Sequence, residues 1–358
     1  MSLFEETLAD LKHKKSRKES GKPNGIPFPF SRFREYITDI EPGSYIGLLA
    51  ASGVGKSKLS RFITIYSAID YSIKNDYPIK VIYFALEDEK KKVMKNIICH
   101  YLLKRHGYKT SLWYLESKGD YTLSNEALHL IENDKAFFEQ LGKILLIVDD
   151  CLSPNEIESK CDLIQESLKN SEIHVLCVVD NYANIIPDET QDEWTAVRYF
   201  SRNIVRLKLC KKYNWTVFGI LQQDVDTEKN IFRMVASGKS SAASVEPNGS
   251  SISNVKVLIR DFYYAIGLFN PWKYEIEKYP NHKGYDISIL RNKVRFINLF
   301  KSNESEVGGR LGIYFGDCET FTELPHILDE VEVQNLYQHV ITEEKEKRQK
   351  YVNKNLFS

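Results

Sequence analysis

A short glycine-bearing loop at residues 50–57, A-A-S-G-V-G-K-S, has the residue types and spacing of a phosphate-binding site. Successive backbone N–H groups of such a loop, followed by the start of a helix, form a concave surface for anionic oxygens. Lys56 would reach the terminal phosphates of a nucleotide, and the Ser57 hydroxyl would bind Mg²⁺. The pattern G-x-x-x-x-G-K-[ST] begins here with Ala50, which is small enough to keep the turn. The residues expected to line this site are Ala50, Ser52, Gly53, Val54, Gly55, Lys56, Ser57 and Lys58.

The segments on either side of the loop predict the elements that hold it. An apolar run at residues 45–49 is typical of a strand, and apolar residues recur at helical spacing over residues 59–73. A phosphate-binding loop requires this order of strand, loop and helix. The alternative is a polar surface turn that happens to precede a helix, and the strand before the loop argues against it.

Two further strand ends carry polar groups that could take part in chemistry. Residues 79–86 are rich in β-branched and aromatic side chains and end at Glu87. Ligands of open α/β sheets bind at the carboxyl ends of the strands, where Glu87 could polarise a water that attacks a γ-phosphate. Residues 215–221 predict another strand, and the amide of Gln222 at its end could sense the γ-phosphate. Alternatively, Gln222 simply leaves the sheet into solvent.

Two aspartates compete for the role of a magnesium ligand. Asp149 follows an apolar run at residues 144–148, and Asp180 follows a similar run at residues 174–179. Between them, residues 153–169 begin with an N-cap serine and a proline and predict a helix. The order of strand, helix and strand is that of a βαβ unit in a parallel sheet. Spacing alone does not decide between the two aspartates.

Length and composition allow one large α/β domain or two smaller ones. The chain has 358 residues, 42% of them hydrophobic, and its formal net charge is zero. A nucleic acid would therefore have to bind local basic surface, because the molecule as a whole carries no cationic field. The six cysteines are scattered without CxxC spacing and predict buried free thiols in a reducing cytosol. No apolar run is long enough to span a bilayer, so we expect a cytoplasmic protein without a membrane partner.

The ends of the chain are less regular. Residues 2–15 predict a short amphipathic helix that needs a partner surface, or else a fraying terminus. A long stretch rich in Ser, Gly, Ala and Asn, residues 224–253, predicts a functional or disordered loop. Two strands are expected at residues 257–267 and 294–300, and the latter continues through a turn into a hairpin partner at residues 311–315. The charged residues 343–355 predict a solvated helix.

The order of these segments resembles the RecA-type ATPase core of DnaB-like hexameric replicative helicases, over about residues 26–325. The motifs that carry the resemblance are F-A-L-E at residues 84–87, D-D-C-L-S-P-N-E-I at 149–157, V-V-D-N-Y at 178–182, I-L-Q at 220–222 and F-T-E-L-P at 321–325. The implied fold is an α/β, RecA-like P-loop NTPase, with a largely parallel central sheet flanked by helices and a C-terminal β-hairpin. Its implied divisions are a leader at residues 1–25, the ATPase domain at 26–330 and a tail helix at 331–358.

The resemblance also assigns roles to residues. It implies that Glu87 is the catalytic base, that Gln222 senses the γ-phosphate of ATP, and that Asp180, in place of Asp149, binds Mg²⁺ with Ser57. Lys301 matches the basic K-x-R element, which would complete the catalytic site of a neighbouring subunit.

Two departures from the family stand out. The position of the family's arginine finger is Asn303 here, so that either Lys301 alone or Arg310 would supply the charge, or activation between subunits is weak. Too few residues precede Gly47 for the family's N-terminal helical domain, which points to a compact version from a phage or mobile element, acting in a bacterial or phage-infected cell.

The implied activity is ATP-dependent unwinding of DNA by a ring, expected to be a homohexamer, that translocates on single-stranded DNA. Arg233 and Lys239 are candidate DNA contacts, and a primase or loader is a candidate partner. The second hypothesis is a RecA-fold ATPase that is not a helicase: a recombinase, a loader or a KaiC-like switch. A third, a nucleotide-binding structural subunit without turnover, conflicts with the presence of Lys56, Ser57, Glu87 and Asp180.

Overall fold

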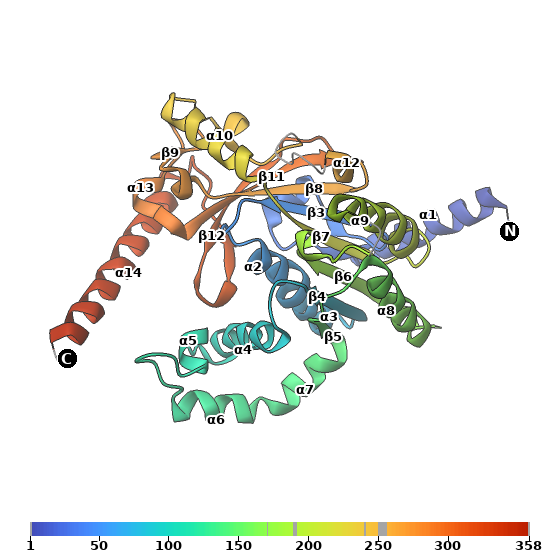
Figure 1. The fold of residues 1–358 in the computed structure, drawn as a ribbon, viewed down its shortest axis with the longest axis horizontal. Helices are drawn as coiled ribbons and strands as arrows, with labels where there is room; N and C mark the ends of the chain where they lie inside the picture. Colours follow the sequence, from blue (N-terminus) through green and yellow to red (C-terminus); the bar gives the residue numbers. More distant parts are fainter. Residues whose placement is uncertain (1, 170, 189–191, 240, 250–255, 357–358) are drawn as a thin grey trace.

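One large sheet forms the centre of the molecule (Figure 1). The structure, a computed structural model, describes residues 2–169, 171–188, 192–239, 241–249 and 256–356. The strand order in this nine-stranded sheet is β13-β12-β11-β8-β3-β7-β6-β4-β5. The strands are β3 (Tyr45–Ala50), β4 (Ile79–Ala85), β5 (Leu145–Val148), β6 (His174–Asp180), β7 (Thr216–Gln222), β8 (Tyr264–Phe269), β11 (Val294–Ser302), β12 (Arg310–Phe315) and β13 (Phe321–Glu323).

The sheet is parallel over most of its width. Strands β8, β3, β7, β6, β4 and β5 pair in parallel, whereas β11, β12 and β13 extend the sheet in antiparallel pairs. The predicted α/β class, the largely parallel sheet and the C-terminal hairpin are therefore confirmed. Smaller ladders are formed by β1 (Ile26–Pro27) with β2 (Asp39–Ile40) and by β9 (Lys278–Tyr279) with β10 (Tyr285–Asp286).

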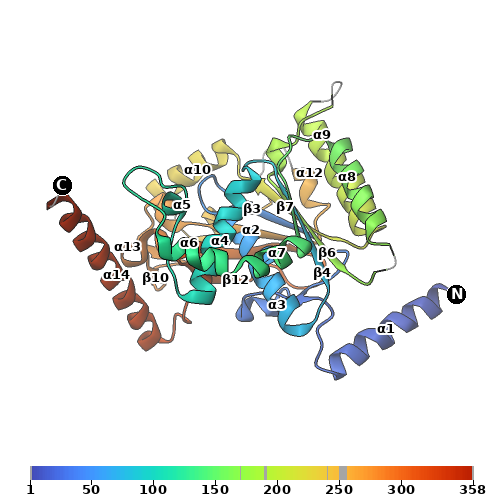
Figure 2. The ribbon, with the colours of Figure 1, turned by 90° about the horizontal axis from the view of Figure 1, so that it is seen from below.

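Helices cover both faces of the sheet (Figures 1 and 2). They are α1 (Leu3–Glu19), α2 (Lys56–Arg61), α3 (Ala68–Asn75), α4 (Lys90–His106), α5 (Leu112–Leu115), α6 (Asn125–Asn133), α7 (Lys135–Ile144), α8 (Pro154–Ser167), α9 (Glu193–Tyr199), α10 (Val225–Ala236), α11 (Ala242–Val245), α12 (Lys256–Ile259), α13 (Ile287–Leu290) and α14 (Glu330–Leu356). A π-helical turn, Phe62–Ser67, joins α2 to α3, and another, Phe200–Cys210, continues α9. The helix expected at residues 59–73 is thereby confirmed.

The central strand β3 shows how the two faces form separate cores. Ile46 and Leu48 belong to the hydrophobic cluster beneath α2, α3 and α4, whereas Tyr45 and Leu49 belong to the cluster beneath α8 and α9. Side chains alternate between the faces of a strand, so a strand buried on both faces is apolar at every position. This is why residues 45–49 form an uninterrupted apolar run.

Two segments differ from the sequence-based expectation. The strand expected at residues 257–267 begins only at Tyr264, because α12 and a turn precede it. The expected loop at residues 224–253 contains helix α10, whose Ile231 and Val235 lie one turn apart and pack on a third core with α13 and α14. A helical period was therefore present in the sequence, although its polar composition favoured a loop; residues 240 and 250–253 of this stretch lie outside the described residues.

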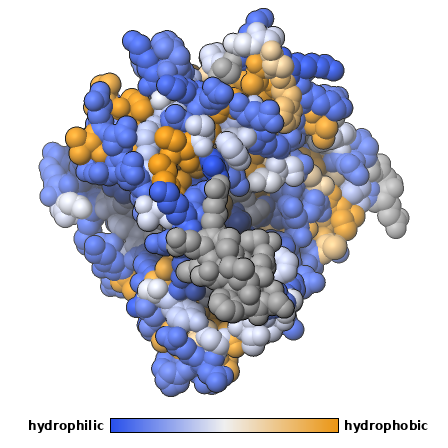
Figure 3. All heavy atoms as spheres, turned by 90° about the vertical axis from the view of Figure 1, so that its left-hand side faces the viewer, coloured by the Kyte–Doolittle hydropathy of each residue, from blue (hydrophilic) through white to orange (hydrophobic). Residues whose placement is uncertain are grey.

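The last helix, α14, begins before the solvated helix expected at residues 343–355, and its first part packs on the body of the molecule. Val333, Tyr337 and Val340 of α14 are buried at spacings of four and three residues against this third core. Around it, the surface that carries α10 and α14 is mostly hydrophilic, with apolar side chains in separate patches (Figure 3).

The first helix stands away from the body of the molecule (Figure 2). None of the residues of α1 is buried, and Leu3 and Phe4 are 80% and 73% exposed. The helix is held mainly near its end, where Lys14 pairs with Glu41 at 3.3 Å and Arg17 donates to the Pro23 carbonyl. The structure thus shows an ordered helix with an unpartnered apolar side.

The expectation of buried free cysteines is met in part. All six cysteines are free, but only Cys99, Cys161, Cys177 and Cys210 are buried, while Cys151 is exposed and Cys318 is half-buried. Within the described residues, no helix combines the length and the apolar character needed to cross a bilayer.

Candidate nucleotide site

The predicted phosphate loop lies between the end of β3 and the start of α2. Gly53 and Gly55 have φ angles of +73° and +108°, which side chains with a Cβ rarely adopt. Val54 is buried between them and holds the loop against the core. The strand, loop and helix expected from the sequence are therefore present. Helix α2 begins where the loop ends, and the N–H groups of its first turn have no partners within the helix.

Lys56 is buried at the base of the loop. Its Nζ donates to the carbonyl of Ala51 at 3.3 Å. Burial lowers the pKa of the ammonium group, and the nearby carboxylates of Glu87 and Asp180 oppose this effect. Two negative charges thus face the lysine that is expected to bind phosphates, as required for a cation that must stay protonated.

The carboxylate of Asp180 lies against the first turn of α2. Its Oδ1 accepts a hydrogen bond from the Ser57 hydroxyl at 3.1 Å, and its Oδ2 accepts one from the buried Tyr83 hydroxyl. Burial raises the pKa of Asp180, whereas these two hydrogen bonds favour the ionised form. A hydroxyl and a carboxylate are hard oxygen donors of the kind that Mg²⁺ prefers, so the pair fits that ion.

Asp149 lies elsewhere. It follows β5, which is the edge strand and is separated from β3 by β4, β6 and β7. Its carboxylate accepts from the backbone N–H of Lys90 at 2.9 Å and pairs with the Lys90 ammonium, so that it caps the start of α4. Residue spacing alone did not decide between the two aspartates. The strand order does, because it brings Asp180 next to the phosphate loop and leaves Asp149 at the edge of the sheet.

Glu87 is exposed at the end of β4, beside Asp180 on the neighbouring strand β6. The side-chain amide of Asn181, which is itself buried, donates to Glu87 Oε2 at 3.0 Å. Asn181 thus orients the carboxylate while leaving it open to a water molecule. Sequence reasoning did not single out this amide.

The end of β7 brings two glutamines next to the loop. Gln222 pairs in register with Ala50 and its side chain is exposed, as expected of a group that could sense a ligand. Gln223 is buried, and its backbone N–H donates to the Ala50 carbonyl at 2.9 Å. The side-chain nitrogen of Gln223 has no hydrogen-bond partner among the described residues.

Lys301 and Arg310, the alternatives for the charge that acts on a neighbour, lie on β11 and β12. Lys301 donates to the carbonyls of Arg260 and Phe262, towards the end of β11 that is remote from the phosphate loop. Arg310 forms a two-pronged ion pair with the buried Glu246, with N–O distances of 2.5 and 2.8 Å. Both cations are thus engaged away from the phosphate loop of their own chain.

The two candidate DNA contacts are exposed. Arg233 lies in the last turn of α10, and Lys239 follows the end of that helix. The Arg233 side chain donates to Asn230 at 3.3 Å. Both residues are therefore accessible to an outside partner.

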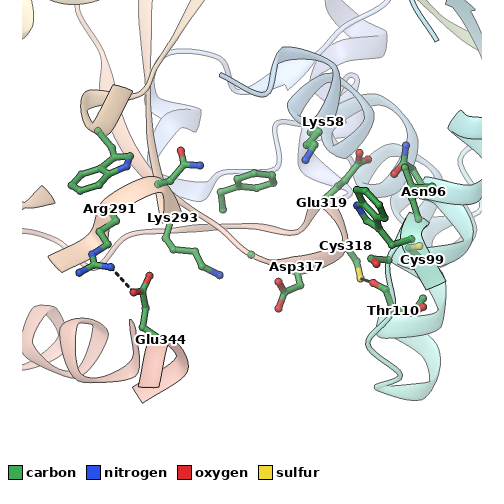
Figure 4. Close-up of a pocket in the computed structure, with 17 residues that line it drawn as sticks. Lys58, Asn96, Cys99, Thr110, Arg291, Lys293, Asp317, Cys318, Glu319 and Glu344 are labelled. Atoms are coloured by element: carbon green, nitrogen blue, oxygen red, sulfur yellow. Dashed lines mark hydrogen bonds and ion pairs between the residues drawn. The ribbon is translucent and has the colours of Figure 1, made fainter. Parts of the chain in front are cut away.

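A cavity of about 650 Å³ lies beside α2, the helix that follows the phosphate loop (Figure 4). Lys58 of α2 forms part of its wall, opposite Arg291 and Lys293, and the turn Asp317–Glu319 closes one side. The Phe315 ring lies 5.0 Å from Lys58 Nζ. The cavity is flanked by α4 and α5 on one side and by α14 on the other, so no local sequence pattern could have predicted it.

A buried polar cluster links this cavity to Asp180. Arg61 pairs with Glu319 through two hydrogen bonds of 2.5 and 2.9 Å, and Tyr66 donates to the same carboxylate. Arg61 also lies 3.4 Å from the Tyr83 hydroxyl, which in turn contacts Asp180. The helix that follows the phosphate loop is thereby tied both to the cavity and to the expected metal ligand.

Solved structures share this architecture. A solved ATPase domain superposes with a TM-score of 0.65 at 16% identity, over 91% of this chain and 100% of that one. A DnaB-like replicative helicase, solved in a study of its interactions with primase, gives a TM-score of 0.61 at 16% identity, over 87% of this chain and 65% of that one. The chain has the fold of these two ATPase structures, an α/β fold built on a largely parallel sheet, and the fold inferred from the sequence is thus confirmed.

Other comparisons add little. A KaiC-like protein of the archaeon Pyrococcus horikoshii gives a TM-score of only 0.46 at 10% identity, too low to carry an argument. No protein-family model matches the sequence, and no curated protein matches it.

Proposed function

We propose that this chain is an ATP hydrolase of the DnaB-like helicase type, which assembles into a homohexameric ring and translocates on single-stranded DNA. The observation that carries the proposal is the contact between Ser57 and Asp180, which brings a loop hydroxyl and a strand-end carboxylate within 3.1 Å. Lys56 and Glu87 lie around the same point. The RecA-like helicase fold supports the proposal.

In this proposal each group has a distinct task. The loop N–H groups and Lys56 hold the phosphates of ATP, while Ser57 and Asp180 hold Mg²⁺. When bound, Mg²⁺ would neutralise charge that develops on the phosphates. Glu87 accepts the proton of the attacking water, and Gln222 contacts the γ-phosphate from the neighbouring strand.

We place the nucleoside half of ATP in the cavity beside α2. The first turn of α2 binds the phosphates, and Lys58 extends from that turn into the cavity wall (Figure 4). The exposed indole of Trp272, which also lines the cavity, offers an aromatic face on which a base can stack.

Hydrolysis would depend on assembly and on DNA. Lys301 or Arg310 would complete the site of an adjacent subunit, since both lie away from the loop of their own chain. Arg233 and Lys239 would contact DNA phosphates without reading bases. A primase or loader is the candidate partner, since one structural relative was solved in a study of its interactions with primase.

The second candidate is a RecA-fold ATPase without unwinding activity, such as a recombinase, a loader or a switch. One observation favours it: Asn303 stands where the family has its arginine finger, and Arg310 is already paired with Glu246. In that case ATP turnover would control assembly, with no mechanical work on DNA.

Steady-state ATP hydrolysis tests the proposal, measured with and without single-stranded DNA for the wild type, Glu87→Gln and Lys56→Ala. We expect DNA to stimulate the wild type by at least about tenfold and Glu87→Gln to lower turnover by about 10²- to 10⁴-fold, the usual contribution of a general base. Glu87→Gln should still bind ATP, whereas Lys56→Ala should not.

The outcomes separate the candidates. Turnover that is indifferent to DNA would favour the non-helicase ATPase. Turnover that survives Glu87→Gln would remove Glu87 from the mechanism, and absence of ATP binding by the wild type would overturn both candidates.

A further inference from the structure

A carboxylate lies on the phosphate loop. Glu228 of α10 reaches across from the segment after β7, and its Oε1 accepts a hydrogen bond from the Ser52 backbone N–H at 3.2 Å. The Glu228 side chain is only 16% exposed. An N–H of a phosphate loop is a donor for anions, so the carboxylate oxygen stands where a phosphate oxygen can bind.

Lys273 completes the arrangement. Its Nζ lies 2.7 Å from the other oxygen of Glu228 and 3.0 Å from the Ser52 carbonyl. Lys273 lies in the 3₁₀ turn Pro271–Tyr274, directly after β8, the strand beside β3. A backbone N–H and an ammonium group, supplied by separate segments, thus hold one anionic group over the loop.

Both charges act on the lysine of the loop. Burial lowers the pKa of Lys56, while the Glu228 carboxylate raises it and the Lys273 ammonium lowers it. Charges that affect the Lys56 ammonium in this way lie near the place where that ammonium binds terminal phosphates. The Glu228 carboxylate is therefore close enough to the Lys56 ammonium to act on its charge.

We propose that Glu228 occupies the loop until ATP binds, and that Lys273 then transfers from Glu228 to the terminal phosphate. This inference rests on the proposed function, which assigns ATP to the loop. A carboxylate and a phosphate repel each other and cannot both accept from the Ser52 N–H. Lys273, already in contact with the loop, is freed when the carboxylate leaves and becomes a second phosphate-binding cation beside Lys56.

The exchange reaches beyond the nucleotide. Glu228 belongs to the first turn of α10, and Arg233 lies in the last turn of the same helix. Release of Glu228 removes a contact that holds this helix to the loop. Nucleotide binding is thereby connected to the exposed segment that carries the candidate DNA contacts.

The affinity for a non-hydrolysable ATP analogue with Mg²⁺, measured by calorimetry, tests both parts. Glu228→Gln removes the competing charge and should lower the Kd about fivefold, given the strength of charge-assisted hydrogen bonds. Lys273→Gln removes a cation and leaves Glu228 unneutralised, so the Kd should rise about tenfold. Asp226→Asn is the matched control, because Asp226 lies on the same helix, pairs with the exposed Lys229, and should leave the Kd unchanged.

The double variant Glu228→Gln/Lys273→Gln isolates the role of the lysine. With the competing carboxylate absent, binding weaker than that of Glu228→Gln alone reports contact between Lys273 and phosphate. Equal binding by these two variants would overturn the transfer of Lys273. Lys273→Arg keeps the charge and should bind the analogue with a Kd within about twofold of that of the wild type. This result would show that the weaker binding of Lys273→Gln comes from the lost charge and not from a loss of folding.

The remaining outcomes distinguish this inference from the proposed function. If the wild type binds the analogue and Glu228→Gln does not bind it more tightly, Glu228 does not compete for the loop and the inference fails alone. If the wild type binds no nucleotide at all, the proposed function fails and the inference fails with it.

Discussion

The two oxygens of Asp180 have separate partners. Ser57 donates to Oδ1 from the loop side, and the fully buried Tyr83 donates to Oδ2 from the strand side. A carboxylate held at both oxygens keeps one orientation, which is what a metal ligand needs. Tyr83 could not be recognised from the sequence, because it appears there only as one more aromatic residue of a buried strand.

Tyr83→Phe should therefore raise the Mg²⁺ concentration needed for half-maximal ATP hydrolysis by about tenfold, the usual effect of losing such a supporting hydrogen bond. Binding of ATP without metal should stay unchanged. A Mg²⁺ titration of the hydrolysis rate measures the shift. Tyr66→Phe is the control, since Tyr66 lies in the same buried cluster but donates to Glu319. An equal shift in both variants would show that the effect comes from core packing and not from the hydrogen bond to Asp180.

Strand β6 carries Asp180 at one end and His174 at the other. The His174 ring bonds Thr216 at 2.8 Å and Tyr77 at 3.2 Å, and so ties the start of β6 to β7 and to the turn after α3. Burial lowers the pKa of His174 to about 4. The folded chain therefore keeps this imidazole neutral where an unfolded chain would protonate it.

The stability of the chain should decrease in mild acid because of His174. Between pH 6.5 and about 4 the unfolded state binds a proton at His174 that the folded state does not, so stability falls as the pH falls through this window. The loss approaches about 3 kcal/mol at the lower end. Urea unfolding of the wild type and His174→Gln at pH 7 and pH 5 measures it, and the variant should lose less stability between the two pH values. An identical loss in both proteins would contradict the assignment.

Helix α2 is joined to the turn after β12 by an ion pair that is almost fully buried. The Arg61 and Glu319 side chains are 3% and 5% exposed. Arg61→Met would leave the Glu319 carboxylate without its cation, and loss of one partner of a buried pair costs about 3–5 kcal/mol. Urea unfolding measures this cost. Lys135→Met, which breaks an exposed pair with Glu139, should leave stability nearly unchanged, and similar effects of both substitutions would contradict the buried role.

At the scale of the whole molecule, the sequence predicted what local patterns determine. The phosphate loop, its flanking strand and helix, and the strand before Glu87 each show a pattern within one stretch of chain. Which of Asp149 and Asp180 meets Ser57 depends on the strand order, which no single stretch contains. The contact of Glu228 with Ser52 joins residues 176 positions apart, so it appears only after folding.

Apolar residues at helical spacing were also present in two segments whose composition is mostly polar. Val333, Tyr337 and Val340 form an apolar stripe on the first part of α14, ahead of the charged residues 343–355 for which a solvated helix was predicted. Similarly, the polar composition of residues 224–253 concealed α10. In both cases a few apolar side chains at helical spacing decided the structure, because burying them stabilises a helix more than its polar face opposes it.

The apolar side of α1 provides a test of assembly. In the described chain Leu3 and Phe4 are largely exposed, and a single helix gains stability when such residues pack on a partner. We expect Leu3→Ser/Phe4→Ser to shift the protein towards smaller species in analytical ultracentrifugation and to lower hydrolysis per subunit. The thermal transition of the domain should stay in place. Unchanged sedimentation would exclude this helix as a contact between subunits.

If the chain is a helicase, ATP hydrolysis at the phosphate loop must drive its movement on DNA. The most direct measurement is unwinding of a forked DNA duplex by the purified wild type with ATP and Mg²⁺, beside Glu87→Gln. We predict strand separation that requires hydrolysable ATP and is absent in Glu87→Gln. ATP turnover by the wild type without any strand separation, on forks with tails of either polarity, would contradict the proposed helicase activity.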